Sequence, residues 1–581
     1  MRTRANILTT ASVISVGLGL LASVTPAVAA KDKEVKYVQK ASSYDKLAPA
    51  KKGGTLYEGI ADNPKVLNPI ISTDQTSRVV EPYLWATLFT EDMNTLEPLP
   101  YLAESYSITP DRKTYTFVLN PDATWEDGTK VTTDDVKFSF DTMMNPKTLG
   151  AAAARSYWEG VQLEVVDPRK FKFSVKEPKF DTLRSLYLFQ PIQKKQFENE
   201  PDFNKARGIL NPIGDGVYRL KAFLRDQRME LERKKDWWGY KLKYFKERFN
   251  YDQIGYRVIS DPNLEYERFL KGDLDIQNFF GSGTEIFATK VHGTDKDKVG
   301  TKPGDGKTVW ATEIENKAPR GYDYVGWNLH NPIFQSAKTR TALAYLVDYQ
   351  QIIDKVYYGY RYQCTSPFGS RTMYSAPDLR EASRMIKFNR KKAIELLKED
   401  GWAPEADNML HKTIDGKKVD FKFTLKFNSN NPLRAKIAQI IKENFKAGGV
   451  AVEIRSMEWN AFIDDVDHRN FEALILGWGA TPFPNPNQEW STDSQKNEGS
   501  NFVGYSNPKV DEMIVKANLE FDLKKRAKML QEINRILYAD QPYLFLTEPR
   551  SMIAGFNKKI RSSVWAMTYD IDPPEDLYTI E

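Results

Sequence analysis

The sequence predicts an α/β protein of more than one domain, and three observations lead to this prediction. The chain has 581 residues, which is too long for a single hydrophobic core. Its first half is rich in alternating, strand-like segments, and helical patterns are scarce before residue 260. Its second half alternates strands with amphipathic helices, which is the pattern of a parallel sheet.

The composition is that of an ordinary globular protein. Hydrophobic residues make up 41% of the chain and charged residues 28%, values that fit neither a disordered nor a membrane-embedded protein. Loss of Arg2 and Arg4 with a cleaved signal lowers the formal charge from +5 to +3, which is too little for a dedicated nucleic-acid surface. We therefore expect no nucleic-acid partner.

The N-terminus has the pattern of a cleaved export signal. Arg2 and Arg4 precede a mostly apolar stretch, residues 7–24, and small residues then place the cleavage site near Ala29 and Ala30. A membrane anchor is the alternative, but serine and threonine dilute the stretch and no basic flank follows it. A protein exported in this way, without an anchor, fits the periplasm.

The residues that usually carry chemistry are sparse. The single cysteine, Cys364, excludes a disulfide framework and a thiolate metal cluster, and it lies far from the signal, so it is no lipid-attachment site. The four histidines are widely separated and show no metal-ligand spacing. The run at 302–308 lacks the first glycine of a phosphate-binding loop, and no nucleophile elbow occurs. We expect no catalytic residues, no metal and no cofactor.

The elements follow in order along the chain. Residues 30–52 are lysine-rich and aperiodic, which predicts a flexible leader. Residues 114–120 and 171–175 alternate apolar and polar side chains and are expected to be strands. In the second half, a strand over 421–429 is followed by a helix that starts at Pro432, and a further strand ends at Ile454.

The next apolar run ends in the sequence GWGATPFPNP, residues 477–486. The run from 471 to 480 predicts a third parallel strand, and the three prolines must fall outside it. Ligands of open parallel sheets lie beyond the carboxyl ends of the strands, so this segment predicts a cleft. Its glycines allow another backbone to approach closely, and Trp478 offers a broad apolar wall. The alternative for Trp478 is a position in the hydrophobic core.

Several blocks together resemble the family 5 solute-binding proteins, which are large receptors of peptide-importing ABC transporters. They appear in the family's order from about Gly53 to the C-terminus. The quoted blocks are LAESYSITPDRKTYTFVLNPDATWEDGTKVTTDDVKFSF (102–140), NPIGDGVYRL (211–220), LERKKDWWG (231–239), the F-x-x-G-D-x-D-I run (269–276), PIFQSAKTRTALAYLVDYQQII (332–353) and GWGATPFPNP.

The resemblance implies an α/β, two-lobed periplasmic binding protein fold of cluster C with an extra domain. Its hinge would lie near 309–313 and 546–549. The implied division of the chain is 1–29 signal peptide, 30–52 flexible leader, 53–85 with 205–310 and 546–581 lobe one, 86–204 extra domain, and 311–545 lobe two.

The implied function is that of a receptor and not of an enzyme. The two lobes would close over an oligopeptide and present it to the permease of an inner-membrane ABC transporter, with the receptor acting as a monomer. Extended peptides pair their backbone with exposed strand edges. The candidate ligand-binding residues are Ile60, Ala61, Asp62, Asn63, Arg320, Gly477, Trp478, Gly479, Ala480 and Thr481.

One position departs from the family's pattern. Peptide receptors of this family usually carry an aspartate for the ligand's terminal amine where this chain has Thr481. A hydroxyl supplies no charge for a buried ammonium, so we expect a ligand whose N-terminus is blocked or is held elsewhere. The sequence around Thr481 resembles that of the branch that imports microcin C-like, N-blocked peptides. Asp62 is a candidate replacement for the missing charge, although a turn before Pro64 explains it equally.

Two other functions stay open. The same receptor role for an oligosaccharide would use tryptophans that stack on sugar rings, with Trp327, Trp459, Trp478 and Trp490 as candidates. A periplasmic hydrolase would need an activated nucleophile, and the sequence shows no motif for one.

Overall fold

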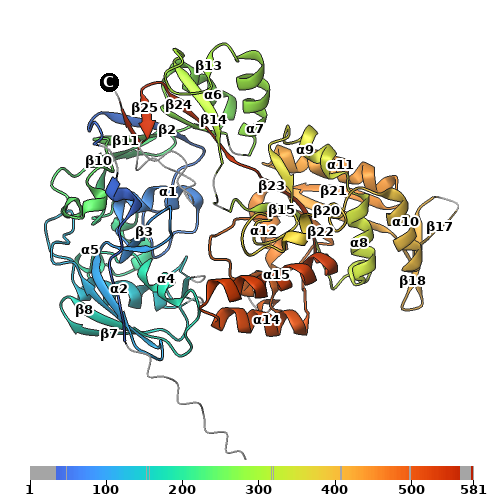
Figure 1. Ribbon diagram of the computed structural model, residues 1–581, viewed down its shortest axis with the longest axis horizontal. Coiled ribbons are helices and arrows are strands. Elements are labelled where there is room, and N and C mark those ends of the chain that lie inside the picture. Colours follow the sequence, from blue (N-terminus) through green and yellow to red (C-terminus); the bar gives the residue numbers. More distant parts are fainter. Residues whose placement is uncertain are drawn as a thin grey trace, which may run out of the picture.

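A computed structural model describes residues 34–46, 49–151, 154–155, 158–279, 281–315, 317, 319–405, 408–495, 499–562 and 577–579. The predicted export signal therefore lies outside the described residues. Within them, no helix is both long enough and apolar enough to cross a membrane. The described chain forms two bodies of mixed helix and strand that face each other (Figure 1).

Lobe one is built on an eight-stranded mixed sheet. Its strand order is β13-β14-β24-β12-β2-β11-β10-β9, with β2 parallel to both β11 and β12. The sheet therefore combines segments from both ends and from the middle of the chain. Its elements are β2 (Thr55–Ile60), β9 (Tyr218–Leu224), β10 (Arg228–Arg233), β11 (Gln253–Val258), α6 (Pro262–Lys271), β12 (Ile276–Asn278), α7 (Gly283–Ile286), the π-helix η6 (Phe287–Thr294), β13 (Val299–Gly300), β14 (Val309–Ile314) and β24 (Met552–Asn557).

The extra domain is built on a five-stranded antiparallel sheet of order β1-β5-β6-β8-β7. Its aromatic core continues into lobe one, where Tyr101 contacts Trp237 and Phe245 with ring centroids 5.9 and 4.8 Å away. The two units therefore pack as one body. The extra-domain elements, with the neighbouring helix α1, are β1 (Val35–Lys36), α1 (Gln75–Leu84), β3 (Phe89–Glu91), β4 (Pro98–Pro100), β5 (Ala103–Ile108), β6 (Thr114–Leu119), α2 (Thr133–Met144), β7 (Gln162–Asp167), β8 (Lys170–Ser174), α4 (Thr182–Tyr187) and α5 (Lys194–Phe197).

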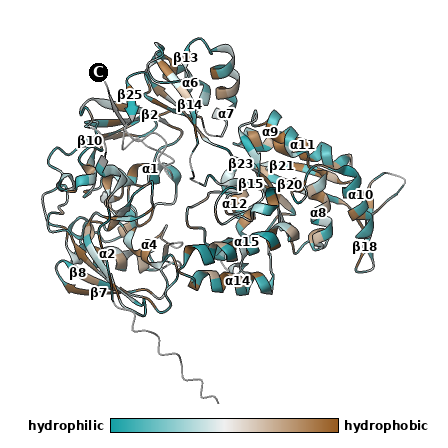
Figure 2. Cartoon of the chain, in the orientation of Figure 1, coloured by the Kyte–Doolittle hydropathy of each residue, from teal (hydrophilic) through white to brown (hydrophobic). Residues whose placement is uncertain are grey.

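Lobe two is built on a six-stranded sheet of order β16-β23-β15-β22-β20-β21. Its surface helices carry hydrophilic and hydrophobic residues together, as Figure 2 shows for α14 and α15. The elements are β15 (Tyr322–Trp327), α8 (Ala337–Leu346), α9 (Tyr349–Lys355), β16 (Arg361–Gln363), α10 (Arg390–Glu399), β17 (Ala403–Pro404), β18 (Leu410–Ile414), β19 (Lys417–Asp420), β20 (Lys422–Asn428), α11 (Pro432–Lys446), β21 (Ala451–Met457), α12 (Trp459–Asp467), β22 (Ala473–Trp478), α13 (Asn487–Trp490), α14 (Pro508–Leu519), α15 (Leu523–Asp540) and β23 (Tyr543–Pro549).

The predicted parallel unit of lobe two is confirmed. Strand β20 is parallel to β21 and to β22, so the three carboxyl ends share one edge of the sheet. Asn431 caps α11 by accepting a hydrogen bond from the backbone N–H of Arg434, and Pro432 opens the helix. Strand β15 runs antiparallel to β22 and pairs Tyr322 with Trp478. The start of β15 therefore lies at the same edge.

The chain crosses between the lobes at places that differ from the expected ones. Residues 309–313 lie inside β14, which pairs with β24 along its whole length, and residues 546–549 lie inside β23. The crossings follow these strands: the chain leaves β14 at Ile314 and enters β15 at Tyr322, and it returns through Arg550 and Ser551.

The described residues of the expected flexible leader pack against the extra domain. Strand β1 pairs antiparallel with β5. Tyr37 packs edge-on against Phe89, at 5.1 Å between ring centroids, and the Asp92 carboxylate accepts hydrogen bonds from Ser42 and Ser43. Aromatic packing and a buried carboxylate thus hold residues that the lysine-rich composition predicted to be free.

Candidate functional site

A cavity of 250 Å³ lies between lobe two and the extra domain. We call it the interlobe cavity, because the extra domain packs with lobe one as one body. Lobe two supplies the carboxyl end of β22 and the loop after it, the start of β15 and part of α13, and the extra domain supplies α4 and its cap. The lining residues are Asp181, Arg184, Ser185, Tyr322, Pro367, Phe368, Trp478, Gly479, Ala480, Thr481, Phe483, Pro484, Asn485, Glu489 and Trp490.

Trp478 forms a fixed aromatic wall of this cavity. Its ring stacks on Phe502, with centroids 5.8 Å apart and planes 5° apart, and its indole N–H donates to the Tyr543 hydroxyl at 3.3 Å. The side chain is only partly buried. Packing and the hydrogen bond fix the ring, so its exposed part presents a rigid apolar surface to the cavity.

Two glycines near Trp478 are required by close packing, and a third is not. Gly321 has φ +77°, and a Cβ there would come within 2.2 Å of the Trp478 carbonyl oxygen. A Cβ on Gly477 would lie 2.9 Å from Asp323 Oδ1. A Cβ on Gly479 would meet no atom within 4 Å, so the backbone there faces open space. A visiting main chain can therefore approach at Gly479.

The extra domain supplies a polar wall. The Arg184 guanidinium donates two hydrogen bonds of 2.7 Å to the buried Glu91 carboxylate, and it lies 5.3 Å from the centre of the Phe483 ring. The Asn485 amide donates to Asp181 Oδ2 at 3.1 Å and so joins the two bodies across the cavity. The charge of Arg184 is balanced by Glu91, and the lining also holds two acidic side chains, Asp181 and Glu489.

Glu489 is the most distinctive of these acidic groups. Burial raises the pKa of Glu489 from 4.5 to about 7. Among the described residues its carboxylate forms no ion pair, while the rings of Tyr322, Trp478 and Trp490 line the same cavity. A carboxylate surrounded by aromatic rings is suited to a cationic group such as an ammonium.

Contacts next to the cavity join the extra domain to lobe two. The Phe180 N–H donates to the Asn518 carbonyl at 2.9 Å, and the buried Arg526 guanidinium stacks 3.3 Å above the Phe180 ring. Arg112 stacks 4.2 Å above Phe521 in the same way. Figure 1 shows α4 opposite α14 and α15 in this region. The two bodies therefore touch on the side of the molecule away from the crossings.

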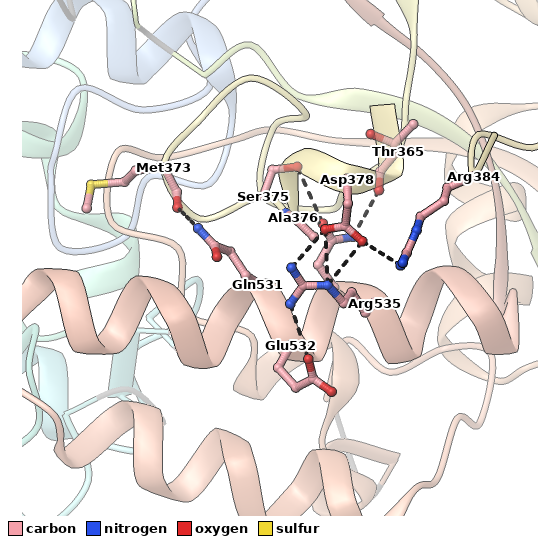
Figure 3. A network of polar contacts seen from close by, with 10 residues as sticks. Thr365, Met373, Ser375, Ala376, Asp378, Arg384, Gln531, Glu532 and Arg535 are labelled. Atoms are coloured by element: carbon pink, nitrogen blue, oxygen red, sulfur yellow. Dashed lines mark hydrogen bonds and ion pairs between the residues drawn. The ribbon is translucent and has the colours of Figure 1, made fainter. Parts of the chain in front are cut away.

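The segment that carries Phe368 is fixed by α15. The Asn534 amide donates to the Thr365 carbonyl at 2.9 Å, and its oxygen accepts from the Ala376 N–H at 2.9 Å. Arg535 binds Asp378 at 2.8 Å (Figure 3). These bonds hold the loop between β16 and α10 in one position against lobe two.

Comparison with known proteins identifies the family. The model of the bacterial extracellular solute-binding proteins, family 5 Middle, matches residues 97–500, which is more than half of the chain. The chain belongs to this family. The prediction made from the sequence blocks is thus confirmed, and family 5 proteins are binding proteins rather than enzymes.

Relatives of this family 5 protein cover most of its length. The oligopeptide-binding protein AppA of Bacillus subtilis is 29% identical over 546 residues, which is 91% of both chains. The probable peptide-binding protein YejA of Agrobacterium fabrum is 24% identical over 559 residues, covering 88% of this chain and 87% of YejA. The solved structure of Bacillus subtilis AppA in complex with a nonapeptide has a TM-score of 0.74 at 25% identity, covering 92% of this chain and all of AppA. The predicted two-lobed α/β fold is confirmed.

The structure brings some of the predicted site residues together and separates others. Trp478, Gly479, Ala480 and Thr481 line the interlobe cavity, whereas Gly477 lies outside the lining and close to Asp323. The Thr481 hydroxyl accepts a hydrogen bond from the Phe483 N–H at 3.2 Å, within its own loop.

The remaining predicted residues lie outside the lining of the interlobe cavity. Ile60 ends β2 in lobe one, Ala61 and Asp62 are exposed, and the Asn63 amide binds Asp226 at 2.5 Å. Arg320 lies at the crossing between the lobes, where its guanidinium donates to the Ile314 carbonyl at 3.4 Å. Of the four candidate tryptophans, Trp478 and Trp490 line the cavity, Trp327 is buried against Phe334, and Trp459 is exposed on α12.

Sequence reasoning missed the extra-domain wall and Glu489. Asp181 and Arg184 lie about 300 residues before Trp478 in the chain, so no local pattern joins them. Glu489 follows the proline-rich loop and is close in sequence to the predicted strand end. The presence of an acidic residue just after that loop is the signal that could have identified it.

Proposed function

We propose that this protein is a periplasmic receptor that captures an oligopeptide in the interlobe cavity and passes it to the permease of an inner-membrane ABC importer. One observation carries the proposal: the carboxyl end of the parallel strands of lobe two faces the extra domain across a lined cavity. The bound nonapeptide of Bacillus subtilis AppA supports an oligopeptide as the ligand. The receptor acts as a monomer.

A peptide is favoured by the kind of surface that the cavity offers. The backbone of Gly479 faces open space, and Thr481 is exposed next to it. The main chain of a ligand can form hydrogen bonds along this strand end, and these bonds do not depend on the ligand's side chains. The rings of Trp478 and Phe483 can then cover apolar side chains of various shapes, because an aromatic wall provides apolar contact area rather than directional hydrogen bonds.

Glu489 is the group that would hold the ligand's charged end. Its carboxylate lacks a cation partner among the described residues, and pairing with an ammonium would restore a charge that burial disfavours. Glu489 would thus supply the negative charge that Thr481 lacks. The expectation of an N-blocked ligand stays a prediction, and Glu489 favours the opposite outcome.

Mass spectrometry of the ligand that co-purifies with the mature protein tests the peptide proposal directly. A second test is incubation with a defined peptide pool. A receptor returns the peptides unchanged, and its Tm rises. The bound peptide adds about 2.7 kcal/mol to the free energy of unfolding when its concentration is a hundredfold above Kd. Turnover of the pool would favour a hydrolase, and recovery of an oligosaccharide would favour the sugar-binding alternative.

A further inference from the structure

Lobe two contains a second cavity, of 620 Å³, beside β16. We call it the lobe-two cavity. It shares no lining residue with the interlobe cavity, and its volume lies in the range of small-molecule sites, about 300–1,000 Å³. Its walls are Asp348, Tyr349, Gln350, Ile353, Asp354, Gly359, Arg361, Tyr362, Gln363, Ser370, Arg371, Arg380, Met385, Lys387, Phe388 and Glu548.

One wall of this cavity is basic. Arg371, Arg380 and Lys387 all come from the loop between β16 and α10, and all three are exposed. Arg371 stacks 3.8 Å above the ring of Tyr362, and Arg380 donates to the Ser370 carbonyl. Within the described residues, none of the three cations forms an ion pair. Guanidinium and ammonium groups gathered in this way attract an anion.

The other charged groups of the cavity each form a hydrogen bond or an ion pair, and the Glu548 carboxylate also interacts electrostatically with Arg371. Arg361 binds Asp323 at 2.6 Å, and the buried Glu548 carboxylate accepts the Ser370 N–H at 2.9 Å. Asp348 caps α9 by accepting the Gln351 N–H at 3.0 Å, and Asp354 accepts from Gln350 at 2.8 Å. The carboxylates of the lining thus belong to α9, its N-cap and β23, whereas every charged lining residue of the loop between β16 and α10 is a cation.

The basic wall is held in place before any ligand arrives. Its loop is bound to α15 through Asp378 and Arg535, and Gln531 donates to the Met373 carbonyl at 2.8 Å (Figure 3). Met385 and Phe388 line the same cavity, and Phe388 is 41% exposed. A preformed basic wall with apolar neighbours fits a small anion that has an apolar body.

We propose that the lobe-two cavity binds a small solute that combines a carboxylate with a short apolar chain. The carboxylate binds Arg371, Arg380 and Lys387, and the chain packs on Met385 and Phe388. This site is separate from the oligopeptide site, although the loop segment 367–371 contributes residues to both cavities.

Titration calorimetry with 4-methylpentanoate tests this proposal on the full-length mature protein. We expect saturable binding with a Kd of about 1 mM, as is usual for so small a ligand. The neutral amide of the same chain should bind at least about tenfold more weakly, because it lacks the charge that the basic wall recognises. Equal binding of the amide, or no binding of the acid, would overturn the proposal.

Two variants locate the probe. The double variant Arg371→Gln and Lys387→Gln should weaken binding at least about tenfold, whereas Lys391→Gln, which removes a charge outside the cavity, should leave it unchanged. Both changed residues of the double variant are exposed, so an unaltered Tm is expected. Trp478→Ala should leave probe binding unchanged. If Trp478→Ala abolishes it, the probe occupies the interlobe cavity and the assignment is wrong.

Discussion

Replacement of Glu489 by glutamine tests how the interlobe cavity recognises the end of a peptide. The variant Glu489→Gln keeps the shape of the side chain and removes its charge. A hydrogen bond to a charged group contributes about 1.5–3 kcal/mol, which corresponds to roughly 10- to 150-fold in Kd. We expect the Kd of a free-amine peptide to rise by this factor, while the Kd of its N-formylated twin stays within about twofold.

The pH dependence of binding gives an independent measure of the same contact. Burial raises the pKa of Glu489 to about 7, so below this pH the empty cavity holds the protonated acid. An ammonium can pair only after that proton leaves. Affinity for a free-amine peptide should therefore increase with pH from about 5 to 7, by up to about tenfold per pH unit, and then level off. The Glu489→Gln protein should lack this slope.

Titration calorimetry with a peptide and its formylated twin, at several pH values, measures both effects. Glu512→Gln on α14 is the matched control, because its carboxylate is exposed and lies outside the cavity. Equal loss of affinity for both twins would mean that the substitution damages the cavity rather than removes a charge contact. Tighter binding of the formylated twin by the wild type would refute the role of Glu489 and support an N-blocked ligand.

Three further predictions concern stability and closure. Gly321→Ala should cost at least about 2 kcal/mol in the free energy of unfolding by denaturant, since its φ is +77° and a backbone carbonyl lies in the way, whereas Gly479→Ala should change it by less than about 0.5 kcal/mol. Burial raises the pKa of Glu548 from 4.5 to about 7, so the folded state binds the extra proton and stability falls as pH rises through this window. Glu548→Gln should remove this fall, which amounts to up to about 3 kcal/mol in the free energy of unfolding. An unchanged pH profile of stability in the variant would contradict the reasoning. Phe180→Ala removes the ring below the Arg526 guanidinium and should raise the ligand-free radius of gyration in X-ray scattering; an identical radius would show that this contact does not hold the two bodies together.

The parts of the fold that local chemistry determines were predictable from the sequence. The helix after Pro432 begins at that residue, the strand before it differs from its predicted range by one residue at each end, and the strand after it ends three residues beyond Ile454. Here an N-cap, a proline and a stripe of buried residues all indicate the same structure. The cavity at Trp478 also followed from the sequence, because the carboxyl ends of parallel strands share one edge.

The parts that depend on distant pairing were not predictable. The leader holds to the extra domain through Tyr37 and Asp92, and neither contact has a local signature. Asn63 is bound to Asp226, from the turn between β9 and β10, so its segment is tied to lobe one instead of the interlobe cavity. The ends of β14 and β23 are set by their partner strands, and a single sequence does not reveal those partners.

The origin of one wall of the interlobe cavity has a consequence for how such receptors diversify. Residues 181–185 belong to a unit that contributes neither a strand to the sheet of lobe two nor a segment to the two crossings. Substitutions there can reshape one wall of the space offered to a cargo molecule without changing a strand of lobe two or a crossing segment. One wall of the cargo space is thus encoded in a different stretch of the chain from the two crossings, and a lineage can alter that wall without rebuilding the crossings.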